Sequence, residues 1–311
     1  KAQEGTQAVL NVCPTDCTFS SIQEAINAAN PGDTVQVAAG TYIEQLLIQK
    51  DLTLVGAGIG QTIVKAPTSG RATAPGYTSQ VYSGDNWNTD YLLAAYPTDP
   101  VDGDPISVKV SGFTFDANGQ GHIVGDRFTG VYFRKVFNSD ISAAGLFNSE
   151  IKGFSASDPS VTGIRVLESS KLTLSGNLVK DYTILGIVVY GTDNLVDPIV
   201  NTIGNTLTPY GSSEGIQYRF INGTSNFAGT ITGNTVNGGA IPIASTTSDH
   251  ILIQGNTVTG GGNGIVLETT AFTTVSQNTI TGCTYNGVYV QSAWGLSHDN
   301  LIADNTISGI H

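Results

Sequence analysis

The chain has 311 residues, a net charge of −12 and a pI near 4.5, and only 12% of its residues are charged. This composition excludes nucleic-acid partners, since phosphate backbones demand basic stripes, and no apolar run approaches the length of a membrane span. Because Met is absent even at position 1, we expect a secreted chain, extracellular or on the cell surface, that has lost a signal peptide.

Residues 1–19 form a polar tail with a short strand-like run over residues 8–12. Cys13 and Cys17 are close enough to pair, and we expect a disulfide between them in an oxidising compartment. No further Cys or His lies near them in the sequence, so a metal site is not expected there. Cys283 is left over and is expected to be buried.

The next segment, residues 20–29, has the signature of an α-helix. Phe19, Ile22, Ile26 and Ala29 recur at helical spacing, Ser21-x-x-Glu24 forms a capping box, and a Pro-Gly pair follows at residues 31–32. We predict that this helix plugs the N-terminal end of the repeats that follow it.

Residues 67–105 interrupt the strand-like pattern and are predicted to be a loop insertion, which at this length is functional or disordered. Its aromatic residues could wall a glycan groove or pack the loop onto the barrel; they are Tyr77, Tyr82, Trp87, Tyr91 and Tyr96. Two acidic stretches, residues 85–90 and 99–104, carry the oxygen donors that calcium needs. Neither fits a known calcium loop, so we expect no cofactor and retain calcium only as an alternative.

The C-terminal third repeats itself, with Asn256 and Asn278 spaced 22 residues apart. Each period holds two alternating runs rich in β-branched residues, which indicates strands. One run contains an Asn, and these Asn side chains are predicted to stack as a ladder: Asn177, Asn205, Asn234, Asn256, Asn278 and Asn305. The other run begins with Gly-Ile or a variant of it: Gly163, Gly186, Gly215, Ala240, Gly264 and Gly287.

This pattern resembles the right-handed parallel β-helix superfamily, the fold of pectate lyases and galacturonases, and within it the generic secreted and NosD-like branch. The resemblance covers roughly residues 20–311. It implies an all-β fold, a single-stranded right-handed parallel β-helix (solenoid) with an N-terminal capping α-helix. We therefore expect a tail over 1–19 and one solenoid domain over 20–311.

In related polysaccharide enzymes the cleft runs along an exposed sheet, and the Gly-Ile runs correspond to that sheet here. Alternation places two columns of side chains outward. The first is Tyr132, Arg165, Val188, Gln217, Pro242, Val266 and Tyr289, and the second is Arg134, Leu167, Tyr190, Arg219, Ala244, Glu268 and Gln291. The residues predicted to bind a polysaccharide are Tyr132, Arg134, Arg165, Tyr190, Gln217 and Arg219.

No catalytic residue is assigned from the sequence. A glycosidase needs two carboxylates, yet Glu268 is the only acid on these columns, with Asp193 and Glu214 at strand ends. We therefore expect a non-catalytic protein that binds polysaccharide, assembles head to tail with itself, or both. The alternative is a polysaccharide lyase, uronate epimerase or glycoside hydrolase acting in the same groove.

Overall fold

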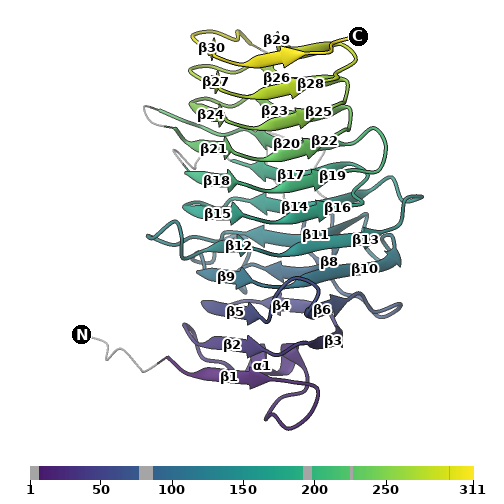
Figure 1. Ribbon diagram of the computed structural model, residues 1–311. Coiled ribbons are helices and arrows are strands. Elements are labelled where there is room, and N and C mark those ends of the chain that lie inside the picture. Colours follow the sequence, from purple (N-terminus) through teal and green to yellow (C-terminus); the bar gives the residue numbers. More distant parts are fainter. Residues whose placement is uncertain (1–6, 77–86, 192–197, 225–226, 294) are drawn as a thin grey trace.

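The chain folds as a right-handed parallel β-helix, as predicted (Figure 1). The computed structural model describes residues 7–76, 87–191, 198–224, 227–293 and 295–311. Each coil contributes one strand to each of three parallel sheets, which we name A, B and C. Within the described ranges, no helix is long and apolar enough to cross a membrane.

Sheet A has eleven strands and sheet B has ten, and both run the length of the stack. Sheet A comprises β1 (Val9–Val12), β2 (Thr34–Val37), β5 (Leu52–Gly56), β9 (Val108–Ser111), β12 (Gly145–Phe147), β15 (Leu172–Ser175), β18 (Val200–Ile203), β21 (Gly229–Thr232), β24 (Ile251–Gln254), β27 (Thr274–Ser276) and β30 (Leu301–Ala303). Sheet B comprises β3 (Gly40–Ile43), β6 (Thr62–Lys65), β10 (Thr114–Gln120), β13 (Glu150–Phe154), β16 (Leu178–Lys180), β19 (Thr206–Thr208), β22 (Thr235–Asn237), β25 (Thr257–Thr259), β28 (Thr279–Thr281) and β31 (Thr306–Ser308).

Sheet C contains the longer strands and the Gly-Ile runs. It comprises β4 (Leu46–Ile48), β8 (Thr89–Ala95), β11 (Arg127–Arg134), β14 (Val161–Leu167), β17 (Leu185–Tyr190), β20 (Glu214–Arg219), β23 (Ile241–Thr246), β26 (Asn263–Glu268) and β29 (Asn286–Gln291), with β7 (Thr73–Ala74) antiparallel to β8. One face of each sheet lines the interior, where Ile, Val, Leu and Phe side chains form a continuous core.

Helix α1 (Ile22–Ala28) lies at the N-terminal end of the stack, beside β1 and β2 (Figure 1). It buries Ile22, Ala25 and Ile26 in the main core. Ser21 is its N-cap and accepts from the N–H of Glu24 at 3.2 Å. The carboxylate of Glu44 accepts the first free N–H groups of the helix, from Ile22 at 2.9 Å and Gln23 at 3.0 Å, so a residue from outside the helix completes its cap.

In the tail, the sulfur atoms of Cys13 and Cys17 are bonded, with their Cα atoms 5.5 Å apart. This disulfide closes a short loop directly after β1, and β1 pairs in parallel with β2. Cys283 is unpaired and buried within the core.

The insertion predicted over residues 67–105 is not one structureless loop. Residues 89–95 form β8, a strand of sheet C that pairs with β4 on one side and β11 on the other. All seven of its residues are buried. The chain therefore continues its regular winding here, and the added residues lie before and after the strand.

The six asparagines predicted to stack occupy one interior turn between sheets A and B. From Asn205 onward, each Oδ1 in the stack accepts the side-chain amide of the preceding Asn, at 2.9 to 3.0 Å in every step. The same oxygen accepts the backbone N–H of the preceding Asn, and the side-chain amide donates a second bond to a carbonyl in the coil before it, as Asn205 does to Leu174. The first five stacked side chains are buried, and Asn305 in the last coil is partly buried.

One predicted register is wrong. In sheet C, Ile216 pairs with Ile243 and Gln217 pairs with Ala244, so Pro242 occupies the position of Gly215. The first column therefore contains Ala244 where Pro242 was predicted, and the second contains Thr246 where Ala244 was predicted. Pro242, and not Ala240, therefore replaces the glycine in this strand. The spacing from Gly215 to Pro242 is 27 residues, whereas the clean repeats are spaced by 22 residues, so the period of the clean repeats does not predict this position.

Candidate functional site

The outer face of sheet C carries the predicted polysaccharide-binding residues. Register places Tyr132 beside Arg165 on adjacent strands, and Tyr190 beside Arg219. Gln217 lies in the first column, in line with Arg165 across the intervening Val188. All six predicted residues thus point from the same face of the sheet, on strands β11, β14, β17 and β20.

The N-terminal half of this face is covered. Tyr132 is fully buried and its hydroxyl donates to the carbonyl of Pro75 at 2.8 Å. Arg134 is 3% exposed, donates to Gly76 at 3.2 Å and pairs with Glu168 at 2.5 Å. Burial raises the pKa of Tyr132 to about 12, so its phenol stays protonated at physiological pH. The two side chains anchor the segment after β7 to the sheet.

A second hydrophobic cluster explains this covering. It lies outside the barrel, between the sheet and the added segments, and its members include Tyr91, Tyr96, Tyr132, Leu167, Val188 and Tyr190. Tyr96 packs edge-on to Tyr132 with ring centroids 6.3 Å apart. Of the insertion's aromatics, Tyr91 and Tyr96 therefore pack onto the barrel, Trp87 is 40% exposed, and Tyr77 and Tyr82 lie outside the described residues.

Farther along the face, Tyr190 lies between two guanidinium groups. The guanidinium carbon of Arg165 is 5.6 Å from the ring centroid and that of Arg219 is 5.8 Å away. These distances place both cations within range of the ring quadrupole. Arg165 is buried, whereas the side chain of Arg219 is 30% exposed, so Arg219 is the cation at the edge of the open half of the face.

Glu214, the first residue of β20, is a site residue that the sequence columns missed. Its Oε2 lies 3.7 Å from Nη2 of Arg219 and has no hydrogen-bond partner among the described residues. Burial raises the pKa of Glu214 and the charge of Glu268 raises it further, while Arg219 opposes this shift. Two carboxylates and one guanidinium therefore interact on this face.

In the C-terminal half of the face the second column is polar and partly exposed, whereas Ala244 and Val266 of the first column are buried. From Arg219 the second column continues through Thr246, Glu268 and Gln291, which are all partly exposed. Tyr289 stands beside it in the first column and is 39% exposed. We refer to Arg219, Thr246, Glu268, Gln291 and Tyr289 together as the open row.

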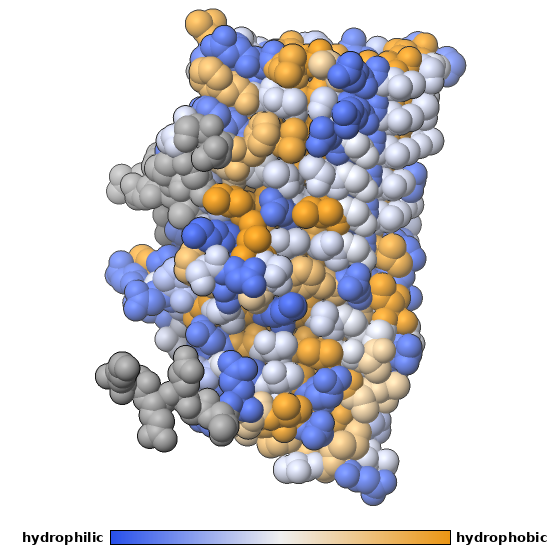
Figure 2. Space-filling model, turned by 60° about the vertical axis from the view of Figure 1, so that its left-hand side comes forward, coloured by the Kyte–Doolittle hydropathy of each residue, from blue (hydrophilic) through white to orange (hydrophobic). Residues whose placement is uncertain are grey.

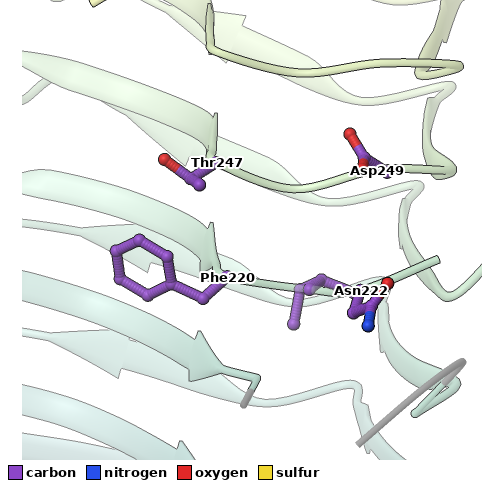
Figure 3. Close-up of a pocket in the computed structure, with 5 residues that line it drawn as sticks. Phe220, Asn222, Thr247 and Asp249 are labelled. Carbon is purple, nitrogen blue, oxygen red and sulfur yellow. The ribbon is translucent and has the colours of Figure 1, made fainter. Parts of the chain in front are cut away.

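A small pocket lies where the chain leaves sheet C after β20 and β23 (Figure 3). Phe220 and Asn222 line it from one coil, and Thr247 and Asp249 line it from the next. Its volume is about 180 Å³, which is smaller than that of a typical small-molecule binding pocket. The pocket opens to solvent. The pocket is a recess beside the open row.

The acidic loops do not form a calcium site among the described residues, since no group of three or more His, Cys, Asp or Glu side chains could hold a metal ion there. Asp99 uses its Oδ1 to accept from Val101 and Asp102 in its own turn. Asp90 is buried with Arg71, at 3.0 Å. Asp85 and Asp193 lie outside the described residues.

Comparison with protein families matches residues 201–311 to the model described as "Periplasmic copper-binding protein (NosD)". The match covers the region of cleanest repeats. Copper sites use Cys, Met and His ligands; the matched residues contain no Met, one buried Cys, Cys283, and three His, at positions 250, 298 and 311. A comparison with curated proteins finds no match.

Solved structures similar to this chain include two polygalacturonases and an alginate lyase. An exopolygalacturonase of Yersinia enterocolitica superposes with a TM-score of 0.68 at 14% identity, over 97% of this chain and 66% of its own. A polygalacturonase of Erwinia carotovora gives 0.55 at 12% identity, over 100% and 80%. The PL6 family alginate lyase AlyGC gives 0.56 at 13% identity, over 97% and 40%.

These similarities and the three parallel sheets define the class: the chain has the fold of the right-handed parallel β-helix superfamily. At these identities the structural similarity concerns the fold alone. This chain spans 66% of the length of the Yersinia enterocolitica enzyme.

Proposed function

We propose that the protein binds polysaccharide along the open row on sheet C. The observation that carries the proposal is the position of Arg219, a partly exposed guanidinium held against Tyr190 at the start of a polar column. Strand spacing sets neighbouring side chains in that column about 4.8 Å apart, so successive groups of an extended chain can each meet one. Tyr289 offers an exposed ring at the far end, and rings stack on sugars.

The ligand class follows from charge. Arg219 can donate paired hydrogen bonds to a carboxylate, which favours an acidic glycan built of uronic acids. In this proposal the ligand does not contact the buried residues Tyr132, Arg134 and Arg165. They stabilise the part of sheet C that precedes the open row. The location we propose is outside the cytoplasm, which the Cys13–Cys17 disulfide supports because such bonds persist in oxidising compartments.

The test is retention of Arg219→Ala on immobilised polygalacturonate or alginate. We expect binding at least about tenfold weaker than that of the wild type, because a hydrogen bond to a charged group contributes about 1.5–3 kcal/mol. The melting temperature should change little. Lys180→Ala, which removes an equal charge from sheet B, is the matched control and should bind as the wild type does. Equal retention of Arg219→Ala and wild type on every glycan would contradict the proposal.

The same incubation tests the enzyme alternative. Glu214 and Glu268 are two carboxylates whose charges interact on this face, and glycosidases act through two carboxylates. A general acid needs a raised pKa, and burial gives Glu214 that direction. New reducing ends would indicate hydrolysis and unsaturated uronate absorbance would indicate a lyase. If either product forms and disappears in Glu214→Gln, the protein is an enzyme of this row.

Head-to-tail self-assembly is a second candidate, favoured by the exposure of core positions in the last coil. Val290, Ile302 and Ile307 are 42%, 45% and 44% exposed, whereas their partners one coil earlier are buried. Figure 2 shows hydrophobic residues at this upper end of the molecule. A second copy could cover them by presenting the outer edge of its β1, which among the described residues is bridged at Val12 by Phe19. Sedimentation should then show association that rises with concentration and is lost in Ile307→Lys; a monomer at all concentrations contradicts it.

A further inference from the structure

The outer face of sheet B carries an ordered array of threonines in its five C-terminal coils. Each of the strands β19, β22, β25, β28 and β31 has two outward positions on either side of an inward apolar residue. The first column is Thr206, Thr235, Thr257, Thr279 and Thr306, and the second is Thr208, Asn237, Thr259, Thr281 and Ser308. We call these positions the threonine array.

The array is regular in two directions. Strand pairing keeps the columns in strict register from Thr206 to Thr306, so neighbours along a column are about 4.8 Å apart. The two columns are two residues apart along each strand, or roughly 6.7 Å. The result is a rectangular lattice in which nine of the ten positions carry a hydroxyl group and eight of them, the threonines, also carry a methyl group.

Sheets normally twist, and flat sheets over many strands need stacking or side-chain ladders to hold them straight. The asparagine stack supplies such a ladder. Each of its last five members immediately precedes the first array residue of its strand, as Asn256 precedes Thr257. Because every step of the stack repeats the same hydrogen bonds, it fixes the position of each strand relative to the next. The array is therefore held rigidly before any ligand arrives.

The hydroxyl groups of the array are available. Thr257, Thr259, Thr279 and Thr306 are exposed. Among the array threonines, all of which the structure describes, the one side-chain hydrogen bond runs from Thr281 to the carbonyl of Val258, at a long 3.4 Å. No member of the array is charged. The surface is uncharged, and apart from the long bond of Thr281 its threonine hydroxyls make no internal hydrogen bonds among the described residues.

Strand propensity alone does not account for this pattern. Thr is favoured in exposed strands for its β-branched shape, and that preference acts equally on sheet A. In the same coils, the outward positions of sheet A are mixed and include large apolar residues; they are Asn201, Ile203, Thr230, Thr232, Leu252, Gln254, Thr274, Ser276, Leu301 and Ala303. In sheet B, by contrast, eight of the ten outward positions are Thr, with Asn237 and Ser308 as the exceptions.

The geometry points to ice as the ligand: we infer that the threonine array is an ice-binding surface. Ice is a neutral, periodic solid of hydrogen-bonding oxygens, so a rigid lattice of hydroxyls can bond to it at many points together. The methyl groups order the intervening water, and the rigid array loses little entropy on binding. Crystalline polysaccharide is less suited, since the array offers no aromatic ring on which a sugar could stack.

The test measures the incorporation of purified protein into a slowly growing ice hemisphere, together with the gap between melting and growth temperatures of single crystals. The wild type should enter the ice and open a gap. The double variant Thr257→Lys, Thr279→Lys should be largely excluded, because long charged side chains in the middle of the array break its flatness. The matched control Thr232→Lys, on the outer face of sheet A, should behave as the wild type does.

Circular dichroism of each variant establishes that it is folded, and the milder pair Thr257→Val, Thr279→Val preserves shape while removing two hydroxyls. We expect that pair to be intermediate. Exclusion of the wild type from ice would overturn the inference, as would equal incorporation of the wild type and the double Lys variant. Retention on crystalline cellulose or chitin without entry into ice would also overturn it and would assign the array to a polysaccharide.

Discussion

The side-chain amide and the backbone N–H of Asn256 both donate to Oδ1 of Asn278, each at 2.9 Å. Since Asn256 also donates to the carbonyl of Ile231 at 2.8 Å, a single side chain joins three successive coils. The same arrangement repeats above and below it. The stack links the stability of the solenoid to the alignment of the surfaces that its strands present.

Replacing Asn256 by Ala should lower the free energy of unfolding by about 1–3 kcal/mol, because it leaves the buried backbone N–H of Asn234 and the buried carbonyl of Ile231 without their partners. Denaturant unfolding monitored by circular dichroism measures this loss. Asn237→Ala on the outer surface of sheet B is the control and should change stability little. Equal stability of the two variants would show that the buried stack contributes nothing beyond an ordinary surface position.

The buried ion pair of Arg71 and Asp90 gives a second prediction. Both side chains are fully buried, with Arg71 Nη2 at 3.0 Å from Asp90 Oδ2 and the guanidinium 4.4 Å from the ring centroid of Phe128. Asp90 also accepts the backbone N–H groups of Ile123 and Gly125. Asp90→Asn should cost about 3–5 kcal/mol, because it leaves a buried cation without its counter-charge.

Thermal unfolding measures that cost, and Asp126→Asn provides its control. Asp126 is exposed and directly follows Gly125, in the segment whose backbone N–H groups Asp90 accepts. Its neutralisation changes the net charge equally without leaving a buried partner unpaired. If Asp90→Asn and Asp126→Asn have the same melting temperature, the ion pair of Asp90 with Arg71 does not contribute the expected stability.

The sequence predicts the solenoid well because successive coils place the same residue types at equivalent positions. An Asn that bonds to an identical neighbour recurs in the six C-terminal coils, and the six stacked positions could be identified from the strand motif that recurs around each of them. Alternation likewise identified the outward face of sheet C. Where the spacing departs from 22 residues, as between Gly215 and Pro242, periodicity no longer fixes the register, and the columns there were misassigned.

The site was less predictable than the fold, for a physical reason. Whether an outward side chain is accessible depends on what covers it, and Tyr132 and Arg134 are covered by Pro75 and Gly76, which no repeat places. The strand β8 within the insertion lacks the Gly-Ile signal, so its pairing was also missed. Glu214 entered the site because its side chain reaches Arg219 from the strand end, which strict alternation does not describe.

The last prediction concerns the pH dependence that Glu214 contributes. Burial raises the pKa of this carboxyl in the folded protein above its ordinary value, and Glu268 adds to the shift despite Arg219. The folded state therefore binds the proton more tightly than the unfolded state. Its contribution to stability is fully present below the ordinary pKa of glutamate and is lost as the pH rises through the raised, folded-state pKa.

Glu214→Gln removes the ionisation and keeps the shape of the side chain. The melting temperature of the variant minus that of the wild type should therefore increase as the pH rises from about 4 to 7. Melting curves across that range measure the difference between the two proteins. Glu24→Gln, at an exposed position on α1, controls for the loss of one negative charge from a chain of net charge −12. A difference that stays constant with pH, or that shrinks as the pH rises, would show that the Glu214 carboxylate is not destabilised by its burial beside Glu268.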